Sequence, residues 1–398
     1  MKSNKNVSNL YIFILISTVL AALLIILYPE ESLNAAKSGI LLWFNTVLPA
    51  LFPFFVCSKV MTRLGIVKIL GRLLEPILRP LFRVPGEASI IFAISITSGY
   101  PIGVQMVSEL RQNKTISRDE AERMLSFCST SGPLFILGSV GAGMFADPLL
   151  GWSIAVSHFS GAIINGLVFR FHGKHNINYS NKRKKLMEVL EEAEENNKKS
   201  SLIVFIGEAI LESFKSLLLI CGYIIFFSIM ISLLEKFSIF ILVSNLIHFV
   251  IPYTNPDIFL SFIKGVFEIT LGCHTLSQLQ SLDFVTACII CTGIISWSGL
   301  SIHAQSLTFI AQTDIRSSIY LITKLFHSIF SMLCAFIFAP FIIDHEPAVS
   351  SVFNVSDILI NQGFTYKLLF STKLMIAVII LFVITAVLNQ LLSIKRSN

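Results

Sequence analysis

Long apolar runs separated by short polar stretches dominate the pattern of hydrophobic and polar positions along the chain. A helix needs roughly 20 apolar residues to cross a bilayer, and eight runs reach about that length. We expect membrane spans at residues 10–28, 39–57, 121–145, 149–171, 202–233, 285–312, 317–343 and 368–394. A further apolar run, 237–253, is nearly as long, and we interpret it as an interfacial or partly inserted helix. The pattern predicts an all-α, polytopic membrane protein.

Two other apolar segments, 87–110 and 257–281, are interrupted near their middle by glycine and polar residues. Each arm has roughly 12 residues and would form a helix about 18 Å long, whereas the hydrocarbon core is about 30 Å thick. We therefore expect two re-entrant helical hairpins. Their tips fall at Ser98–Pro101 and near Thr270–Gly272. Non-helical backbone at that depth is tolerated only against protein or a wet cavity.

Charge fixes the expected orientation. Lysine and arginine cluster in the loops 59–83, 111–123 and 182–185, and the positive-inside rule places these loops and both termini in the cytoplasm. The first hairpin has basic residues on both flanks, whereas Asp257 and Asp283 flank the second. The hairpins therefore enter from opposite faces, and together they form an inverted-topology repeat.

The span after each hairpin is also interrupted, at Ser129–Pro133 in the first half and at Ser296–Gly299 in the second. Paired, broken membrane segments at matching places point to the binding site of a transporter. The alternative for each break is a packing kink between helices. The expected division of the chain is 1–84 (N-terminal spans and a basic interfacial helix), 85–171 (first repeat), 172–201 (charged cytoplasmic linker), 202–255 (span plus interfacial segment), 256–343 (second repeat) and 344–398 (extracytoplasmic loop and C-terminal span).

Composition supports the membrane class. The chain has 398 residues, of which 54% are hydrophobic and only 14% are charged, whereas a soluble domain carries roughly 25% charged residues. Its mean hydropathy is +0.77. The net charge of +6 comes from cytoplasmic loops and needs no nucleic-acid partner. The charged stretch Lys182–Lys199 is interpreted as a solvated connector, with docking of a protein partner as the alternative.

Glu268 is the strongest single candidate for a functional residue, because carboxylates within membrane segments are rare and usually functional. It could bind substrate, coordinate a cation or carry a proton. Lys264 lies one turn earlier and could simply neutralise it as an i, i+4 pair. Three candidate cations, His158, Lys324 and His327, occupy matching places in the two halves and could neutralise an anionic solute or stabilise the bundle.

The predicted substrate site gathers the hairpin tips and the breaks. Its residues are Ser98, Gly99, Tyr100, Gln105, Ser129, Thr130, Ser131, Gly132, Glu268, Thr270, Gly272, His274, Ser296, Trp297, Ser298 and Gly299. No Walker loop, HExxH or GxSxG motif is present, and Glu268 with His274 has no nucleophile beside it. We therefore expect no enzymatic activity, no cofactor and no bound metal.

The strings SGYPIG and EAERMLSFCSTSGPLFILGSVGAGMF resemble the nucleoside-recognition Gate domain, and the whole chain is similar in layout to the YlbJ-type sporulation integral membrane proteins. The resemblance implies that the protein lies in the mother-cell membrane around the forespore and transports dipicolinic acid, which supports formation of the spore cortex. The Gate domain is also similar to concentrative nucleoside transporters. Through that likeness Gly99, Gln105, Ser131 and Gly132 match the first hairpin unit, and Glu268, Thr270, Ser298 and Gly299 match the second.

These observations predict a membrane transporter or facilitator for a small, planar, anionic solute. The alternatives are a nucleoside transporter, and a non-transporting sensor or assembly protein that keeps the Gate fold. Expected partners are the small-molecule substrate and the lipid bilayer. Other sporulation membrane proteins and a second copy of the chain are the candidate protein partners.

Overall fold

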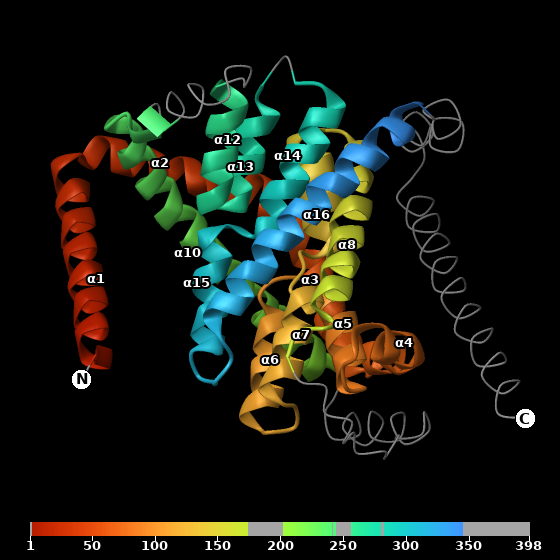
Figure 1. Cartoon of the computed structure of the whole chain (residues 1–398). Coiled ribbons are helices and arrows are strands. Elements are labelled where there is room, and N and C mark those ends of the chain that lie inside the picture. Colours follow the sequence, from red (N-terminus) through yellow and green to blue (C-terminus); the bar gives the residue numbers. More distant parts are fainter. Residues whose placement is uncertain (1, 174–201, 241, 244–255, 280–281, 345–398) are drawn as a thin grey trace, which may run out of the picture.

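A computed structural model describes residues 2–173, 202–240, 242–243, 256–279 and 282–344, and the secondary structure that it assigns there is helical (Figure 1). The helices of the first half are α1 (Lys2–Leu27), α2 (Pro29–Leu42), α3 (Leu48–Arg63), α4 (Ile66–Phe82), α5 (Glu87–Ser98), α6 (Ile102–Gln112), α7 (Arg118–Cys128) and α8 (Pro148–Phe169), with π-helices η1 (Trp43–Val47) and η2 (Phe135–Met144). The second half has α10 (Leu202–Lys236), α12 (Pro256–Phe267), α13 (Ile269–Ser277), α14 (Phe284–Trp297), α15 (Gly299–Ile310) and α16 (Ser317–Asp344).

Five helical segments in the described part of the chain are long and apolar enough to cross a membrane. They are Pro29–Thr62, Pro148–Phe169, Phe205–Lys236, Phe284–Ile310 and Ser317–Ile342. Shorter apolar helices lie at Leu15–Leu27, Glu87–Ser98 and Phe135–Met144. The predicted span 368–394, the stretch Lys182–Lys199 and most of the run 237–253 lie outside the described residues.

Two predicted positions differ clearly. The tip of the second hairpin, expected near Thr270–Gly272, lies at Glu268, because this side chain caps the start of α13. The other difference is the start of one span. The span expected at 39–57 belongs to a helical segment that already begins at Pro29. Glu30 and Glu31 lowered the local hydropathy, yet proline at the first helical position and acidic residues in the first turn are favourable at a helix start. Hydropathy therefore located the apolar part of this helical segment and missed its polar first turns.

The two repeats have the same order of elements. The first consists of the helix pair α5–α6, the broken segment α7–η2 and then α8; the second consists of α12–α13, α14–α15 and α16. The paired helices lie at opposite ends of the molecule, with α6 at the lower end in Figure 1 and α12 and α13 at the upper end. We call the lower end, with the α6–α7 and α15–α16 loops, the basic end. The start of α1 also lies there.

The long helices of the two repeats pack together in the centre. α16 packs on both α8 and α14. A Cβ atom on Gly161 of α8 would overlap Ser331 of α16, so the missing side chain lets these helices cross closely. Buried apolar residues of α8, α14 and α16 join one core cluster with η1, η2 and α13. This scaffold fixes the positions of the helix breaks.

The local sequence explains where α7 begins and ends. Ser117 and Glu120 form a capping box at its start, each side chain bonding to the other residue's backbone N–H. After Cys128 the backbone leaves the helix, and Pro133 begins the next helical stretch, where its missing N–H costs nothing. The predicted break in the span 121–145 is thus present, between α7 and η2.

Helix α4 is the predicted basic interfacial helix, but part of its charge is neutralised within the fold. Glu75 is 4% exposed and forms ion pairs with Arg72 and Arg79. Gly71 contacts the backbone of Ile90, so α4 lies directly against α5. α4 therefore also supports the first hairpin from outside.

Candidate functional site

A cavity lies where both hairpin tips, the first helix break and the part of α15 just after the second break meet. Its empty volume is about 670 Å³, part of which is open. Its polar lining is Ser98, Tyr100, Ser131, Tyr223, Glu268, Thr270, Ser301 and Gln305. Its apolar lining includes Phe54, Phe55, Phe135, Ile220 and Ile302. Aromatic walls with a few hydroxyls suit a small, flat molecule with a polar edge.

Two glycines bring the first hairpin tip against the first helix break. Gly99 has a φ of +71°, a left-handed conformation that disfavours a side chain, and an added Cβ would lie 2.5 Å from the backbone nitrogen of Gly132. The Ser98 hydroxyl is 2.9 Å from that of Ser58 in α3, which fixes the tip from the other side. The tip and the break therefore form one surface of the cavity.

Glu268 lies between α12 and α13 and is 4% exposed. One carboxylate oxygen accepts a hydrogen bond from the backbone N–H of Leu271 at 2.8 Å, and the other accepts from the Thr270 hydroxyl at 3.1 Å. Glu268 thus caps α13 while it lines the cavity. The pairing with Lys264 considered from the sequence is not formed, because the Lys264 ammonium lies 2.8 Å from Glu235 of α10.

The second polar feature is a buried ammonium behind the cavity wall. The Lys324 side chain of α16 donates to the Tyr100 hydroxyl at 2.8 Å, to the Ser129 carbonyl at 2.9 Å and to His327 Nδ1 at 3.1 Å. Lys324 is 1% exposed and does not itself line the cavity. Three donors meet three neutral acceptors, so the charge has hydrogen bonds but no counter-ion among these contacts. The Tyr100 hydroxyl, which accepts from Lys324, in turn donates to the Ile295 carbonyl at 3.3 Å.

Hydrogen-bond roles decide which of the three predicted cations can be charged here. His158 Nε2 accepts from the backbone N–H of Ser131 at 3.0 Å, and Nδ1 lies 2.7 Å from the Ser296 hydroxyl. A ring nitrogen that accepts carries no proton, so His158 is neutral. His327 accepts from Lys324 at Nδ1, so it is neutral as well, and its Nε2 donates to the His158 carbonyl at 3.1 Å. Of the three, Lys324 is the group whose contacts are compatible with a positive charge.

Other predicted site residues stand behind the cavity. Thr130 and Ser129 are buried around the first break. Trp297 donates from its ring nitrogen to the Val266 carbonyl at 3.3 Å and packs edge-on against His303. Of the predicted residues, the cavity lining includes Ser98, Gly99, Tyr100, Ser131, Gly132, Glu268 and Thr270; it does not include Gln105, Ser129, Thr130, Gly272, His274, Ser296, Trp297, Ser298 or Gly299.

Residues absent from the sequence prediction complete the lining. Ser301 and Gln305 lie one turn apart on α15, directly after the second break, and their i, i+4 spacing in an apolar span was an available signal. Phe54 and Phe55 of α3 and Tyr223 of α10 add the aromatic wall. These three lie outside both repeats, so the repeat pattern could not identify them.

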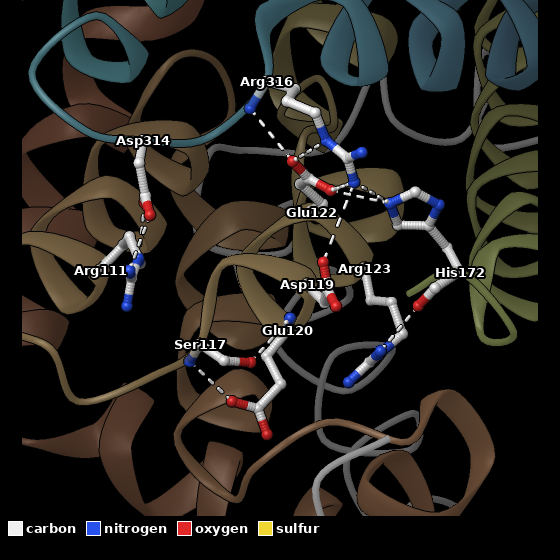
Figure 2. A network of polar contacts seen from close by, with 9 residues as sticks. All are labelled: Arg111, Ser117, Asp119, Glu120, Glu122, Arg123, His172, Asp314 and Arg316. Atoms are coloured by element: carbon white, nitrogen blue, oxygen red, sulfur yellow. Dashed lines mark hydrogen bonds and ion pairs between the residues drawn. The ribbon is translucent and has the colours of Figure 1, made fainter. Parts of the chain in front are cut away.

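A separate polar cluster joins the repeats at the basic end (Figure 2). Arg316 places two guanidinium nitrogens on the Glu122 carboxylate, at 2.9 and 2.5 Å, and lies 3.8 Å from Asp119. His172 Nε2 lies 2.7 Å from the same carboxylate. Burial alone would raise the pKa of Glu122, but hydrogen bonds from Arg316 and His172 outweigh it and hold that pKa below its ordinary value.

Asp119, Glu122 and His172 have the donor types of a divalent metal site, and their ligand atoms lie within 4.8 Å of one another. The guanidinium of Arg316 contacts all three side chains, with its nitrogen 3.0 Å from His172 Nε2. A cation is thus already supplied by the chain, and the cluster fits an ion-pair junction better than a metal centre.

Two more contacts cross the same boundary. Arg111 of α6 forms a two-pronged pair with Asp314, at 2.7 and 2.8 Å (Figure 2). The side chains of Gln112 and Gln312 meet at 3.1 Å. We call these contacts, together with Glu122–Arg316, the inter-repeat latch.

Comparison with known proteins places these features in a family. Residues 44–148, which include the first hairpin and the first break, match the Gate family, described as nucleoside recognition. The chain is 35% identical over 321 residues to the sporulation integral membrane protein YlbJ of Bacillus subtilis (strain 168), covering 77% of each chain. No solved structure matches the chain.

Proposed function

We propose a transport function for this chain, which belongs to the YlbJ family of sporulation integral membrane proteins. The proposed solute is small, planar and anionic, and its binding site is the cavity between the repeats. One observation carries the proposal: both hairpin tips, the first helix break and the part of α15 just after the second break line one cavity. In secondary transporters such breaks hold the solute while one repeat moves against the other.

The polar groups around the cavity support the proposal of an anionic substrate. The Lys324 side chain donates to the hydroxyl of Tyr100, a residue that lines the cavity. This hydroxyl now donates to the Ile295 carbonyl at 3.3 Å, and it can donate to a solute carboxylate instead, strengthened by the bond from Lys324. The only ionisable carboxylate among the lining residues is Glu268, and a dianion needs this group protonated or paired with a cation. Transport of an anion together with a proton or another cation satisfies both groups.

Family membership gives the biological setting of the proposal. The relative's name connects it with sporulation, and by resemblance the solute is dipicolinic acid, moved across the mother-cell membrane around the forespore for the cortex. Dipicolinate is a flat ring with two carboxylates, which matches aromatic walls and a Tyr100 hydroxyl that is hydrogen-bonded to Lys324. Both hairpins are proposed to enter the membrane without crossing it, with the basic end in the cytoplasm.

Uptake into proteoliposomes tests the function. Purified protein is reconstituted and supplied with labelled dipicolinate, and flux is compared with protein-free vesicles and with the Lys324→Met variant. Flux above both controls is expected. If no dipicolinate flux is measured with the protein inserted in either orientation, dipicolinate is not the substrate.

The match to a nucleoside-recognition family makes nucleosides the second candidate. The same vesicles supplied with labelled uridine or adenosine separate the two substrates, since a nucleoside carries no charge for Lys324 to attract. If neither solute crosses but thermal-shift measurements show that one binds, the Gate-fold sensor becomes the better description.

A further inference from the structure

Helices α6 and α15 pack against each other between the cavity and the basic end. Each carries polar residues at helical spacing. On α6 these are Gln105, Ser108 and Gln112; along α15 and just beyond its end they are Ser301, Gln305, Thr308 and Gln312. Spacings of three and four residues place each set along one face of a helix. The helix faces meet at their ends, where Gln112 and Gln312 are hydrogen-bonded at 3.1 Å.

The α15 face runs from the cavity outwards. Ser301 and Gln305 line the cavity and are 1% and 8% exposed, whereas Thr308 and Gln312 are exposed. Polar side chains thus mark a continuous line from the proposed binding site to the basic end. Lipid contact alone would favour apolar residues along this line.

Two buried hydroxyls on these faces, Ser108 and Ser301, have no hydrogen-bond partner within the described residues. Both are 1% exposed. Leaving a buried polar group unpaired is unfavourable, because it has lost water and gained nothing in return. Opening of this interface in a second state would hydrate both hydroxyls.

The inter-repeat latch lies at the outer end of this line. Arg111–Asp314 and Gln112–Gln312 join α6 to the α15–α16 loop, and Glu122–Arg316 joins α7 to the start of α16. Glu122 is fully buried at its side chain, so its pairing with Arg316 is shielded from water on one side. These contacts keep the basic ends of the two repeats together.

The corresponding junction at the opposite end has a different chemistry. If the two repeats are matched element by element, the junction at the opposite end lies between the η2–α8 loop and the α13–α14 loop. The aspartates there cap helices instead: Asp147 caps α8 and Asp283 caps α14. The described side chains around these loops include the apolar Phe145, Leu279 and Leu282, which pack on the core. Among the residues that the structure describes, the polar junction between the repeats is thus at the basic end.

Building on the proposed transport function, we propose that the α6–α15 interface is the solute's passage between the cavity and the basic end, and that the inter-repeat latch holds it closed in this structure. The polar side chains named on these two faces are hydroxyls and amides, and the Glu109 carboxylate accepts a hydrogen bond from Gln105 at 2.9 Å. The passage suits a small solute that exchanges its water shell for hydrogen bonds along the way. Opening requires the latch contacts to break and α6 to separate from α15.

A bridge across the mouth of the passage tests this. In the Gln112→Cys/Gln312→Cys double variant, in a Cys57→Ser background, a short bifunctional thiosulfonate reagent joins the two positions. Uptake is expected to fall at least tenfold and to recover when the bridge is reduced. Each single cysteine variant controls for one-sided modification. A bridged protein that transports at the unbridged rate would overturn the proposal.

A matched pair elsewhere controls for bridging itself. Glu31 and Lys236 form an exposed ion pair between α2 and α10, outside the interface between the repeats. The Glu31→Cys/Lys236→Cys variant, bridged in the same way, is expected to keep its uptake. If the unbridged protein shows no uptake, the proposed transport function fails. The passage is then tested by a measurement that does not depend on transport.

That measurement is the reactivity of a buried position on the passage. Ser108→Cys is treated from the basic side with a membrane-impermeant thiol reagent, with and without Arg111→Gln, which weakens the latch. Labelling is expected to be at least fivefold faster when the latch is weakened. Ser213→Cys, equally buried on α10, should not respond. Equal rates at Ser108→Cys with the latch intact and weakened would contradict the passage whatever the solute.

Discussion

The Lys324 ammonium in α16 lies 2.8 Å from the Tyr100 hydroxyl at the tip of the first hairpin and 4.7 Å from the centre of its ring. These residues come from different repeats and are separated by 224 positions in the chain. Lys324 also donates to the Ser129 carbonyl at the first helix break. One buried side chain of the second repeat therefore holds both irregular segments of the first repeat beside the cavity.

Lys324→Met should weaken uptake of an anion far more than uptake of a neutral solute. The variant keeps an unbranched side chain but removes the buried charge behind Tyr100. We expect KM for an anionic substrate to rise about tenfold or more, which corresponds to about 1.4 kcal/mol. Tyr100→Phe keeps the ring and removes the hydroxyl that links the charge to the cavity, so it should give a smaller effect in the same direction. Equal losses for charged and neutral solutes would indicate damage to packing instead.

Glu268→Gln should impair transport while leaving the fold intact. The amide oxygen can still accept from the Leu271 N–H, so α13 keeps its cap, but the ionisable group is lost. Uptake should fall at least tenfold with little change in the melting temperature. Glu268→Ala is the comparison, because it also removes the cap and should lose about 1 kcal/mol of stability. Normal uptake by the glutamine variant would make the carboxylate a structural cap only.

The membrane topology of the two hairpins can be measured with single cysteines in a Cys57→Ser background. Glu87 and Gln112, at the two ends of the first hairpin, are both exposed. A re-entrant hairpin requires both cysteine variants to react from the cytoplasmic side. Asp257→Cys and Gln278→Cys, at the ends of the second hairpin, should both react only from the opposite side. Labelling of the two ends of one hairpin from different sides would mean that it crosses the membrane.

Gly272→Ala should destabilise the second hairpin. A Cβ at this position would overlap the backbone of Gly265, where α12 and α13 are closest, so the helices would have to separate. Gly222→Ala in α10 is a matched control, since nothing lies within 4 Å of its added Cβ. The free energy of unfolding of this control variant should be unchanged or higher by about 0.5–1 kcal/mol, because alanine favours a helix more than glycine does. Thermal unfolding in detergent gives both values.

The contribution of the latch to the stability of the protein should not change with pH near neutrality. The pKa of Glu122 lies below its ordinary value of 4.5, so the group is ionised and its contribution is complete at neutral pH. A carboxyl with a lowered pKa loses its stabilising contribution only as the pH falls through that pKa. The Glu122→Gln variant should therefore be less stable than the parent by a constant amount, about 1.5–3 kcal/mol, down to about pH 5.

The difference between the parent and Glu122→Gln should shrink below about pH 4, where the parent's carboxyl also becomes neutral. Arg316, His172 and Asp119 face this carboxyl, so the comparison is repeated in a His172→Gln background to remove the imidazole. Thermal unfolding over a pH series provides the measurement. A difference that disappears between pH 8 and pH 6 in both backgrounds would show that another group controls the latch.

Much of the site's location followed from local sequence. Glycine and proline at Gly99–Pro101 and Ser129–Pro133 predicted where helices stop, because these residues disfavour continued helical backbone in any context. Seven of the predicted side chains or glycines line the cavity, including Glu268 and Tyr100. The aromatic contribution of Phe54, Phe55 and Tyr223 could not be predicted in this way, since an aromatic residue in an apolar helix looks the same whether it faces lipid, core or ligand.

Hydrophobicity and helix-breaking residues along the chain by themselves determined that this protein is helical, that it belongs to the membrane class, and where its helices are interrupted. Only the tertiary structure decided which charges meet. Lys264, one turn from Glu268, pairs with Glu235 instead, whereas Lys324 reaches Tyr100 across the interface between the repeats. The physical reason is that helix formation depends on neighbours within about four residues. The partner of a buried charge depends on how distant helices pack, and no local pattern encodes that distance.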